Sequence, residues 1–162
     1  MRIMGLDYGS KTVGVALSDP LGLTAQPLET ITRDSENKLR RTLARLEAIV
    51  KEYQVGSIIL GLPVHMDSSI GQRARKSLEF KTKLENRLQI PVFMQDERLT
   101  TAEADEVLRD MNVPASERKQ YIDKIAAALI LKDYLEAHPE QTALLQEQKG
   151  PEEKKDTETR DT

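Results

Sequence analysis

The spacing of apolar residues predicts strands in the first part of the chain. Two β-rich runs, residues 2–8 and 12–18, are separated by a short turn that contains Gly9, which is typical of a β-hairpin. A third strand is expected over residues 23–31, where Pro27 restricts it to an edge of a sheet or interrupts it.

The second part of the chain alternates between helical and strand patterns. Apolar residues at steps of four and three between 39 and 53 predict an amphipathic helix. The continuous apolar run 57–62 predicts a strand covered on both faces, and residues 91–95 predict another buried strand. A basic helix is expected between these strands, over about 70–88.

Two more helices are expected before the charged end of the chain. Thr100 and Glu103 form a capping-box pattern, so one helix begins there, and Pro114 ends it. The last helix is expected from about Glu117 to His138. The order of elements, three antiparallel strands and then two strand–helix units, predicts a mixed five-stranded sheet flanked by helices, as in ribonuclease H-like domains.

The chain is expected to form one domain over residues 1–138, with a disordered tail over 139–162. Residues 149–162 contain no apolar residue and cannot offset the entropy of ordering. Neither a signal peptide nor an apolar run long enough to span a membrane is visible, so a cytoplasmic location is expected.

Composition excludes several kinds of site. The 162 residues contain no cysteine, which excludes disulfides, thiol nucleophiles, zinc–thiolate sites and iron–sulfur clusters. The two histidines, at positions 65 and 138, are too far apart in sequence to suggest a histidine-rich metal site.

Charge is unevenly distributed along a chain whose net charge is −3. Residues 38–51 and 73–87 each carry a local charge of +4, whereas residues 96–110 carry −4. Basic segments beside an acidic one suit a polyanion bound next to a carboxylate metal site, although solvated helix faces would give the same pattern.

Asp7 is the first candidate for chemistry. It shares one face of its strand with Ile3 and Gly5, and a charged carboxylate among apolar residues needs compensation, for which a metal ion is one source. Nearby glycines, among them Gly5 and Gly14, would let a phosphate backbone approach. A strand-end aspartate that accepts hydrogen bonds from turn amides is the structural alternative.

Asp96 and Glu97 directly follow the predicted strand 91–95, at the strand end where open α/β sheets place their sites. Because they point to opposite faces, only one of them can face Asp7. Arg98 and the threonine pair that includes Thr101 precede a helix N-terminus, which attracts phosphate, although ordinary helix capping explains them as well.

Asp123 lies in the most apolar helix, beside seven consecutive apolar residues. This helix has no broad polar face on which Asp123 could lie. A salt bridge to a buried basic residue would explain it, but Lys124 points about 100° away around the helix axis. Three separated carboxylates without histidine or cysteine favour Mg²⁺ or Mn²⁺ over zinc. Such a metal beside basic helices indicates chemistry on phosphate esters.

Four ordered segments resemble the YqgF family, a bacterial Holliday-junction-resolvase-like group also described as pre-16S rRNA nucleases. They are GLDYGSKTVGVALSD, GLPVHMDSSIG, DERLTTAEA and YIDKIAAALILKDYL, within residues 2–136. The resemblance implies a ribonuclease H-like fold and a catalytic, metal-binding acidic triad at Asp7, Glu97 and Asp123, which selects Glu97 over Asp96. It also implies processing of the 5′ end of 16S rRNA precursor.

The sequence therefore predicts a magnesium-dependent endonuclease that acts on structured nucleic acid. Candidate phosphate contacts are Lys11, Arg73, Arg75, Lys76, Arg98 and Thr101. The alternatives are a resolvase of branched DNA, a non-catalytic nucleic-acid-binding module, and an actin-like or sugar-kinase-type ATPase. The last of these needs two lobes, and this chain has length for one.

Overall fold

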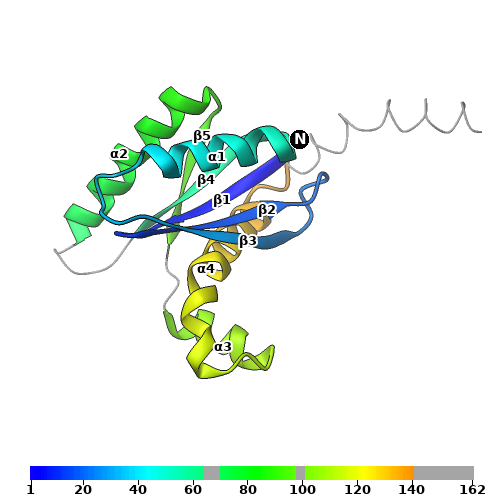
Figure 1. Cartoon of the computed structure of the whole chain (residues 1–162). Helices are drawn as coiled ribbons and strands as arrows, with labels where there is room; N and C mark the ends of the chain where they lie inside the picture. Colours follow the sequence, from blue (N-terminus) through cyan, green and yellow to red (C-terminus); the bar gives the residue numbers. More distant parts are fainter. Residues whose placement is uncertain (64–69, 98–100, 141–162) are drawn as a thin grey trace, which may run out of the picture.

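The computed structural model describes residues 1–63, 70–97 and 101–140. Within them the chain forms β1 (Arg2–Tyr8), β2 (Thr12–Ser18), β3 (Ala25–Thr32), α1 (Arg40–Tyr53), β4 (Val55–Pro63), α2 (Ile70–Leu88), β5 (Val92–Glu97), α3 (Thr101–Asp110) and α4 (Ala115–Ala137). The strands make one sheet in the order β3-β2-β1-β4-β5 (Figure 1). The predicted mixed sheet of three antiparallel strands and two strand–helix units is confirmed.

β1 lies at the centre of the sheet and joins its two halves. It pairs antiparallel with β2, where Asp7 lies opposite Gly14, and parallel with β4, where Leu6 lies opposite Leu60. β5 runs parallel to β4, with Glu97 opposite Pro63. The carboxyl ends of β1, β4 and β5 therefore meet at one edge of the sheet, where open α/β folds place their sites.

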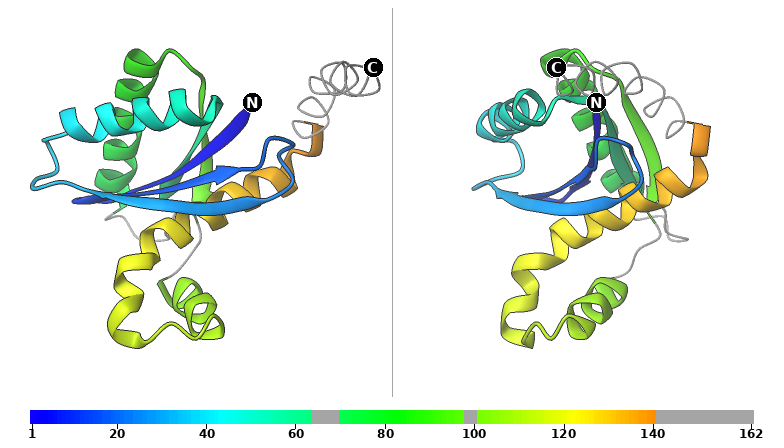
Figure 2. Two further views of the ribbon diagram at one scale, coloured as in Figure 1. Left: turned by 45° about the vertical axis from the view of Figure 1, so that its right-hand side comes forward. Right: turned by 90° about the vertical axis from the view of Figure 1, so that its right-hand side faces the viewer.

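Helices cover both faces of the sheet, and the alternation of β1 decides what each face contacts. Met4, Leu6 and Tyr8 are buried in the core beneath α1 and α2. Ile3 belongs to the second core, formed against α4 on the opposite face. The views in Figure 2 show α4 crossing beneath the sheet, with α3 beside its N-terminal half beyond the sheet.

Two glycines allow α4 to lie directly on the strands. A Cβ atom at Gly14 would lie 1.9 Å from the Asp123 carbonyl oxygen, and one at Gly5 would lie 2.8 Å from the Ala127 carbonyl oxygen. The expectation that these glycines admit a phosphate backbone is wrong, because α4 fills that space. They instead fix how closely the helix approaches Asp7.

The edge strands differ from the predictions in detail. β3 is an edge strand, as expected, and its pairing with β2 shifts register near Pro27. The strand predicted over 91–95 is not fully buried: β5 is the other edge, and Phe93 is 42% exposed. β5 also continues through Glu97, so the acidic pair belongs to the strand and does not follow it.

The helices predicted over 39–53 and 70–88 match α1 and α2, and Pro114 lies between α3 and α4. Thr100, the predicted cap, and residues 141–162, most of the expected tail, lie outside the described residues. Among the described helices, none has the length and apolar character required to cross a membrane.

Candidate active site

Asp7 and Glu97 come together at the carboxyl edge of the sheet. Asp7 is the penultimate residue of β1 and Glu97 is the last residue of β5, two strands away. Their carboxyl groups share a hydrogen bond. Such a bond requires a proton on one of the two groups, so the pair cannot be fully ionised without losing it.

The pKa of Asp7 is raised well above its ordinary value. Burial is the largest cause, followed by the charge of Glu97 and its hydrogen bond, and then by the charge of Asp123. The positive charge of Arg73 acts in the opposite direction and lowers the pKa. The site therefore concentrates more negative charge around Asp7 than its surroundings stabilise, which is the electrostatic condition that a bound cation relieves.

Gly61 of β4 makes room for the Glu97 carboxylate between the two strands. A Cβ atom at Gly61 would lie 3.0 Å from Glu97 Oε2 and 2.6 Å from Ile130 Cδ1. Without a side chain at this position, Glu97 can extend across β4 toward Asp7. Asp96 is exposed while Glu97 is partly buried, so the opposite orientation expected for these neighbours is found.

Asp123 approaches the same place from α4. Its backbone lies against Gly14, the residue opposite Asp7, and its charge raises the Asp7 pKa. Its side chain is only partly buried, whereas the sequence suggested a deeply embedded aspartate. The neighbouring Lys124 places its ammonium 4.5 Å from the Tyr121 ring centroid. The ion pairs among the described residues do not include Asp123.

The donor set fits a hard divalent cation. It contains only carboxylate oxygens, which Mg²⁺ and Mn²⁺ prefer, and it carries excess negative charge. In the part of the chain that the structure describes, no three acidic or histidine side chains are close enough to form a complete metal-binding cluster. The geometry is therefore a hydrogen-bonded pair, Asp7 and Glu97, with Asp123 within electrostatic range.

Some of the residues predicted to contact phosphate lie beside the site, and others are exposed to solvent. Arg73 donates a hydrogen bond from Nη2 to the Tyr8 carbonyl oxygen at 2.9 Å, one residue from Asp7, and its charge lowers the pKa of Asp7. Lys11 and Arg75 are exposed, and Lys76 is bound to Glu36. Arg98 lies outside the described residues, and Thr101 begins α3, but its side chain is not described.

Much of the positive charge of α1 and α2 is paired. Arg45 pairs with Glu29, Arg87 and Lys51 pair with Glu47, and Lys81 pairs with Glu85. These pairs are largely exposed and contribute little to stability. Several basic side chains of these two helices are therefore held in ion pairs.

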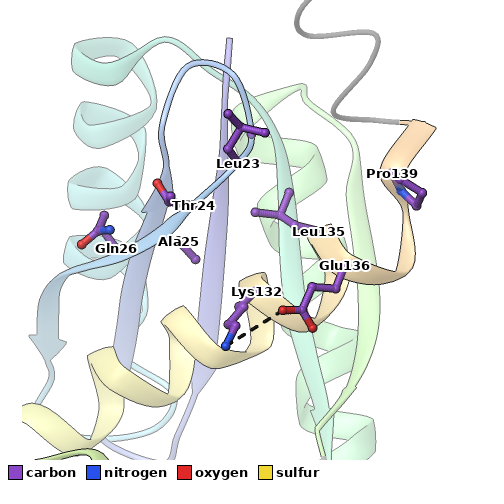
Figure 3. Close-up of a pocket in the computed structure, with 9 residues that line it drawn as sticks. Leu23, Thr24, Ala25, Gln26, Lys132, Leu135, Glu136 and Pro139 are labelled. Carbon is purple, nitrogen blue, oxygen red and sulfur yellow. Dashed lines mark ion pairs between the residues drawn. The ribbon is translucent and has the colours of Figure 1, made fainter.

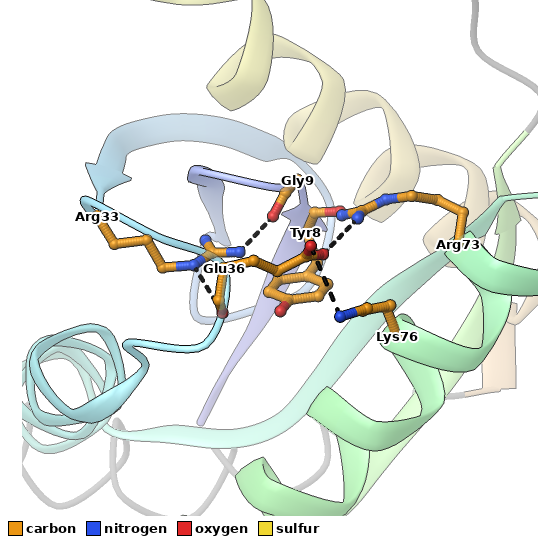
Figure 4. A network of polar contacts seen from close by, with 6 residues as sticks. All are labelled: Tyr8, Gly9, Arg33, Glu36, Arg73 and Lys76. Atoms are coloured by element: carbon orange, nitrogen blue, oxygen red, sulfur yellow. Dashed lines mark hydrogen bonds and ion pairs between the residues drawn. The ribbon is translucent and has the colours of Figure 1, made fainter.

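A polar network that the sequence did not reveal surrounds Tyr8 (Figure 4). The Tyr8 ring stacks on Phe80 at 4.2 Å, and the Arg33 and Arg73 guanidinium groups lie 4.8 and 5.3 Å from its centroid. Arg33 also donates to the Gly9 carbonyl oxygen. The two arginines thus hold consecutive carbonyl groups immediately after Asp7.

A separate pocket of about 540 Å³ lies between the β2–β3 turn and the end of α4 (Figure 3). Its lining includes Leu23, Leu135 and the Lys132–Glu136 pair, whose charged atoms are 4.0 Å apart. The pocket follows the end of β2, whereas Asp7 lies opposite the start of β2. It does not include the acidic residues described above.

Known proteins resemble this chain in both sequence and structure. The family model described as "RuvX: Holliday junction resolvase" matches residues 1–137. A Lachnospira eligens protein named "Putative pre-16S rRNA nuclease" is 58% identical over 137 residues, which cover 85% of this chain and 98% of that protein. A Lactococcus lactis protein of the same name is 53% identical over 137 residues, covering 85% of this chain and 95% of that protein.

Solved structures support the fold. The fowlpox virus Holliday junction resolvase aligns with a TM-score of 0.52 at 18% identity, covering 85% of this chain and 99% of that one. Thermus thermophilus RuvC aligns with a TM-score of 0.50 at 13% identity, covering 86% and 97%. The chain therefore has the ribonuclease H-like fold of the resolvases, as the order of its elements predicted.

Proposed function

Since this chain belongs to the RuvX family, the YqgF family that its motifs resemble, we propose that it is a metal-dependent nuclease that hydrolyses phosphodiester bonds. The observation that carries the proposal is the partly buried Asp7–Glu97 carboxyl pair with Asp123 beside it. A structural salt bridge would supply a cation from the chain itself, whereas here burial and two acids, Glu97 and Asp123, raise the pKa of Asp7 and outweigh the charge of Arg73, which lowers it.

The three acids have a common task in this proposal. Asp7, Glu97 and Asp123 would hold Mg²⁺ or Mn²⁺, which when bound activates water and stabilises the leaving oxygen. The Asp7 carboxyl is held in place by β1 and by the two arginines that fix the carbonyl groups after it. Gly61 leaves open the space beside the Glu97 carboxylate, which a side chain at that position would crowd.

The proposed substrate contacts come from the same edge of the sheet. Arg73 and Lys76 lie beside the end of β1 and would contact phosphates of the bound strand, with Lys11 and Arg75 exposed nearby in sequence. Arg98 and Thr101, which precede and begin α3, are proposed as further contacts on the sequence argument alone.

We propose precursor 16S rRNA as the substrate, acted on in the cytoplasm, because the relatives at 53–58% identity carry that name. Branched DNA is the second candidate, favoured by the description of the family model. A module that binds nucleic acid without cutting it would use the same acids as a metal-dependent binding site.

A cleavage assay separates these functions. Purified protein is incubated with an RNA that spans the 5′ processing site of 16S precursor, or with a four-way DNA junction, in Mg²⁺, Mn²⁺ or EDTA. We expect metal-dependent cleavage of the RNA. Cleavage of the junction alone would favour the resolvase, and binding of both without cleavage would contradict a nuclease.

A further inference from the structure

Three basic side chains converge on Glu36 beside the site, two on its carboxylate and one on its backbone carbonyl group. Arg73 Nη1 lies 2.7 Å from Glu36 Oε1, and Lys76 Nζ lies 3.6 Å from Glu36 Oε2. Arg33 donates from Nε to the Glu36 carbonyl oxygen at 3.4 Å. All three cations lower the pKa of Glu36, the hydrogen bond from Arg73 most strongly, so the cluster keeps an excess of two positive charges.

Arg33 is unusually buried for a group that carries a charge. It is only 9% exposed, and its Nη1 atom is buried without a hydrogen-bond partner in the part of the chain that the structure describes. Its two bonded nitrogens donate to neutral carbonyl oxygens, those of Gly9 and Glu36. A buried guanidinium without its own carboxylate is costly unless an anion compensates it.

The cluster borders the proposed site and is open to a ligand. Arg73 also donates a hydrogen bond to the Tyr8 carbonyl oxygen, and it lowers the pKa of Asp7. Its charge therefore acts on both Glu36 and Asp7. The side chains of Glu36, Arg73 and Lys76 are 28%, 32% and 40% exposed. Glu36 lies in the segment between β3 and α1, outside regular structure (Figure 4).

The same segment continues into a second basic surface. A pocket of about 620 Å³ is lined by residues of 32–41, among them Arg33, Lys38, Arg40 and Arg41, with Asp34 as their acidic neighbour. α1 begins here with two arginines in its first turn and no acidic residue, an arrangement that the helix dipole disfavours until an anion binds. Positive charge thus extends from α2 across the Glu36 segment to α1.

We propose that Arg33, Arg73 and Lys76 form a subsite for a backbone phosphate of the nucleic acid, which the Glu36 carboxylate occupies until the substrate displaces it. The identity of the ligand, a nucleic acid, rests on the proposed function. A phosphate would bind to both partly exposed side chains, Arg73 and Lys76, and would accept the two parallel hydrogen bonds that an arginine can donate. The Glu36 side chain would then rotate into solvent. Glu36 therefore acts as an internal competitor that weakens binding of nucleic acid.

The test measures binding without cleavage. The affinity for a fluorescein-labelled RNA stem-loop is measured in EDTA at several salt concentrations for the wild type, Glu36→Gln and Glu29→Gln. Glu29 is the matched control, since it is 30% exposed and pairs with Arg45 at 2.6 Å, and its replacement changes net charge equally. We expect Glu36→Gln to bind roughly 3- to 10-fold tighter and to steepen the salt dependence by about one phosphate contact.

A second pair of variants keeps the test decisive if Glu36→Gln folds poorly. Lys76→Gln should weaken binding and lower the salt slope by about one contact, whereas Lys81→Gln should change neither. Lys81 lies on the same helix and also pairs with a glutamate, at 2.9 Å. Equal affinities and slopes within both pairs would overturn the subsite.

The subsite and the proposed function fail in different ways. Metal-dependent cleavage by the wild type, together with no difference between Glu36→Gln and Glu29→Gln, would remove the subsite and leave the nuclease. Tighter metal-free binding by Glu36→Gln, without cleavage by the wild type in any metal, would keep the subsite and remove the nuclease.

Discussion

Replacing Asp7 with asparagine will abolish cleavage and will make the metal-free protein more stable. The amide keeps the shape of the carboxylate but loses the charge that holds a hard cation. Loss of a partner that only orients a metal ligand typically costs 10–100-fold, so removal of a ligand should cost at least about 100-fold in cleavage rate.

The gain in stability follows from the raised pKa of Asp7. The folded state holds this proton more tightly than the unfolded chain, so wild-type stability falls as pH rises from the ordinary carboxyl pKa through the raised one. Each pKa unit of difference corresponds to about 1.4 kcal/mol. The advantage of Asp7→Asn in melting temperature should therefore grow across this pH range and then level off.

Asp19 supplies the control with the same change of charge. Burial raises its pKa, but hydrogen bonds from the backbone of Thr24, Leu23 and Leu21 outweigh burial, and the net shift is downward. Asp19→Asn should therefore lose stability at neutral pH and keep cleavage, the opposite of Asp7→Asn on both counts. If both variants cut RNA at the wild-type rate, Asp7 has no catalytic role.

Replacing Gly14 with alanine will lower the stability of the fold more than an ordinary surface change. The new Cβ would lie 1.9 Å from the Asp123 carbonyl oxygen, so α4 must move away from the sheet. Backbone displacement of this kind costs about 3 kcal/mol, the upper end of overpacking, and should lower the melting temperature by roughly 10 °C.

Gly71 provides the matched glycine. It lies in α2, and a Cβ added there meets nothing within 4 Å. Gly71→Ala should therefore match the wild type or gain about 0.5–1 kcal/mol from helix propensity, as measured by thermal unfolding. Equal melting temperatures for the two variants would show that α4 does not rest on Gly14.

The local sequence pattern was sufficient to predict the helices and strands and one face of the site. Strict alternation in β1 predicts that Asp7 shares a face with Ile3 and Gly5, and the structure places this face toward α4. The same alternation separates Asp96 from Glu97. These predictions succeed because side-chain direction in a strand depends only on neighbouring residues.

Contacts between distant segments were not predictable in the same way. Nothing in the local sequence indicates that Gly61 must admit Glu97, or that Glu36 meets Arg73, 37 positions later. The predicted role of Gly14 failed for the same reason, since the space beside it belongs to a helix more than 100 residues further along the chain. Gly61 is visible in the sequence as a glycine inside the apolar run of β4, but the segment that approaches it is not.

Asp123 acts on Asp7 through its charge, without the hydrogen bond that joins Glu97 to Asp7. Its variant is therefore the most informative of the three. Asp123 influences the charge of Asp7 from α4, yet the described residues do not form a closed three-acid cluster. If a cation draws the three acids together, Asp123→Asn should lose cleavage and should lose most of the stabilisation that Mg²⁺ gives the wild type.

The central claim, that Asp7, Glu97 and Asp123 bind one divalent ion together, is tested most directly by the melting temperature as a function of Mg²⁺ concentration. The melting temperatures of the wild type and of Asp19→Asn should rise with Mg²⁺ concentration. Much smaller rises are expected for the three site variants, Asp7→Asn, Glu97→Gln and Asp123→Asn. A wild-type response in Asp123→Asn, or no response in the wild type, would contradict a shared metal site.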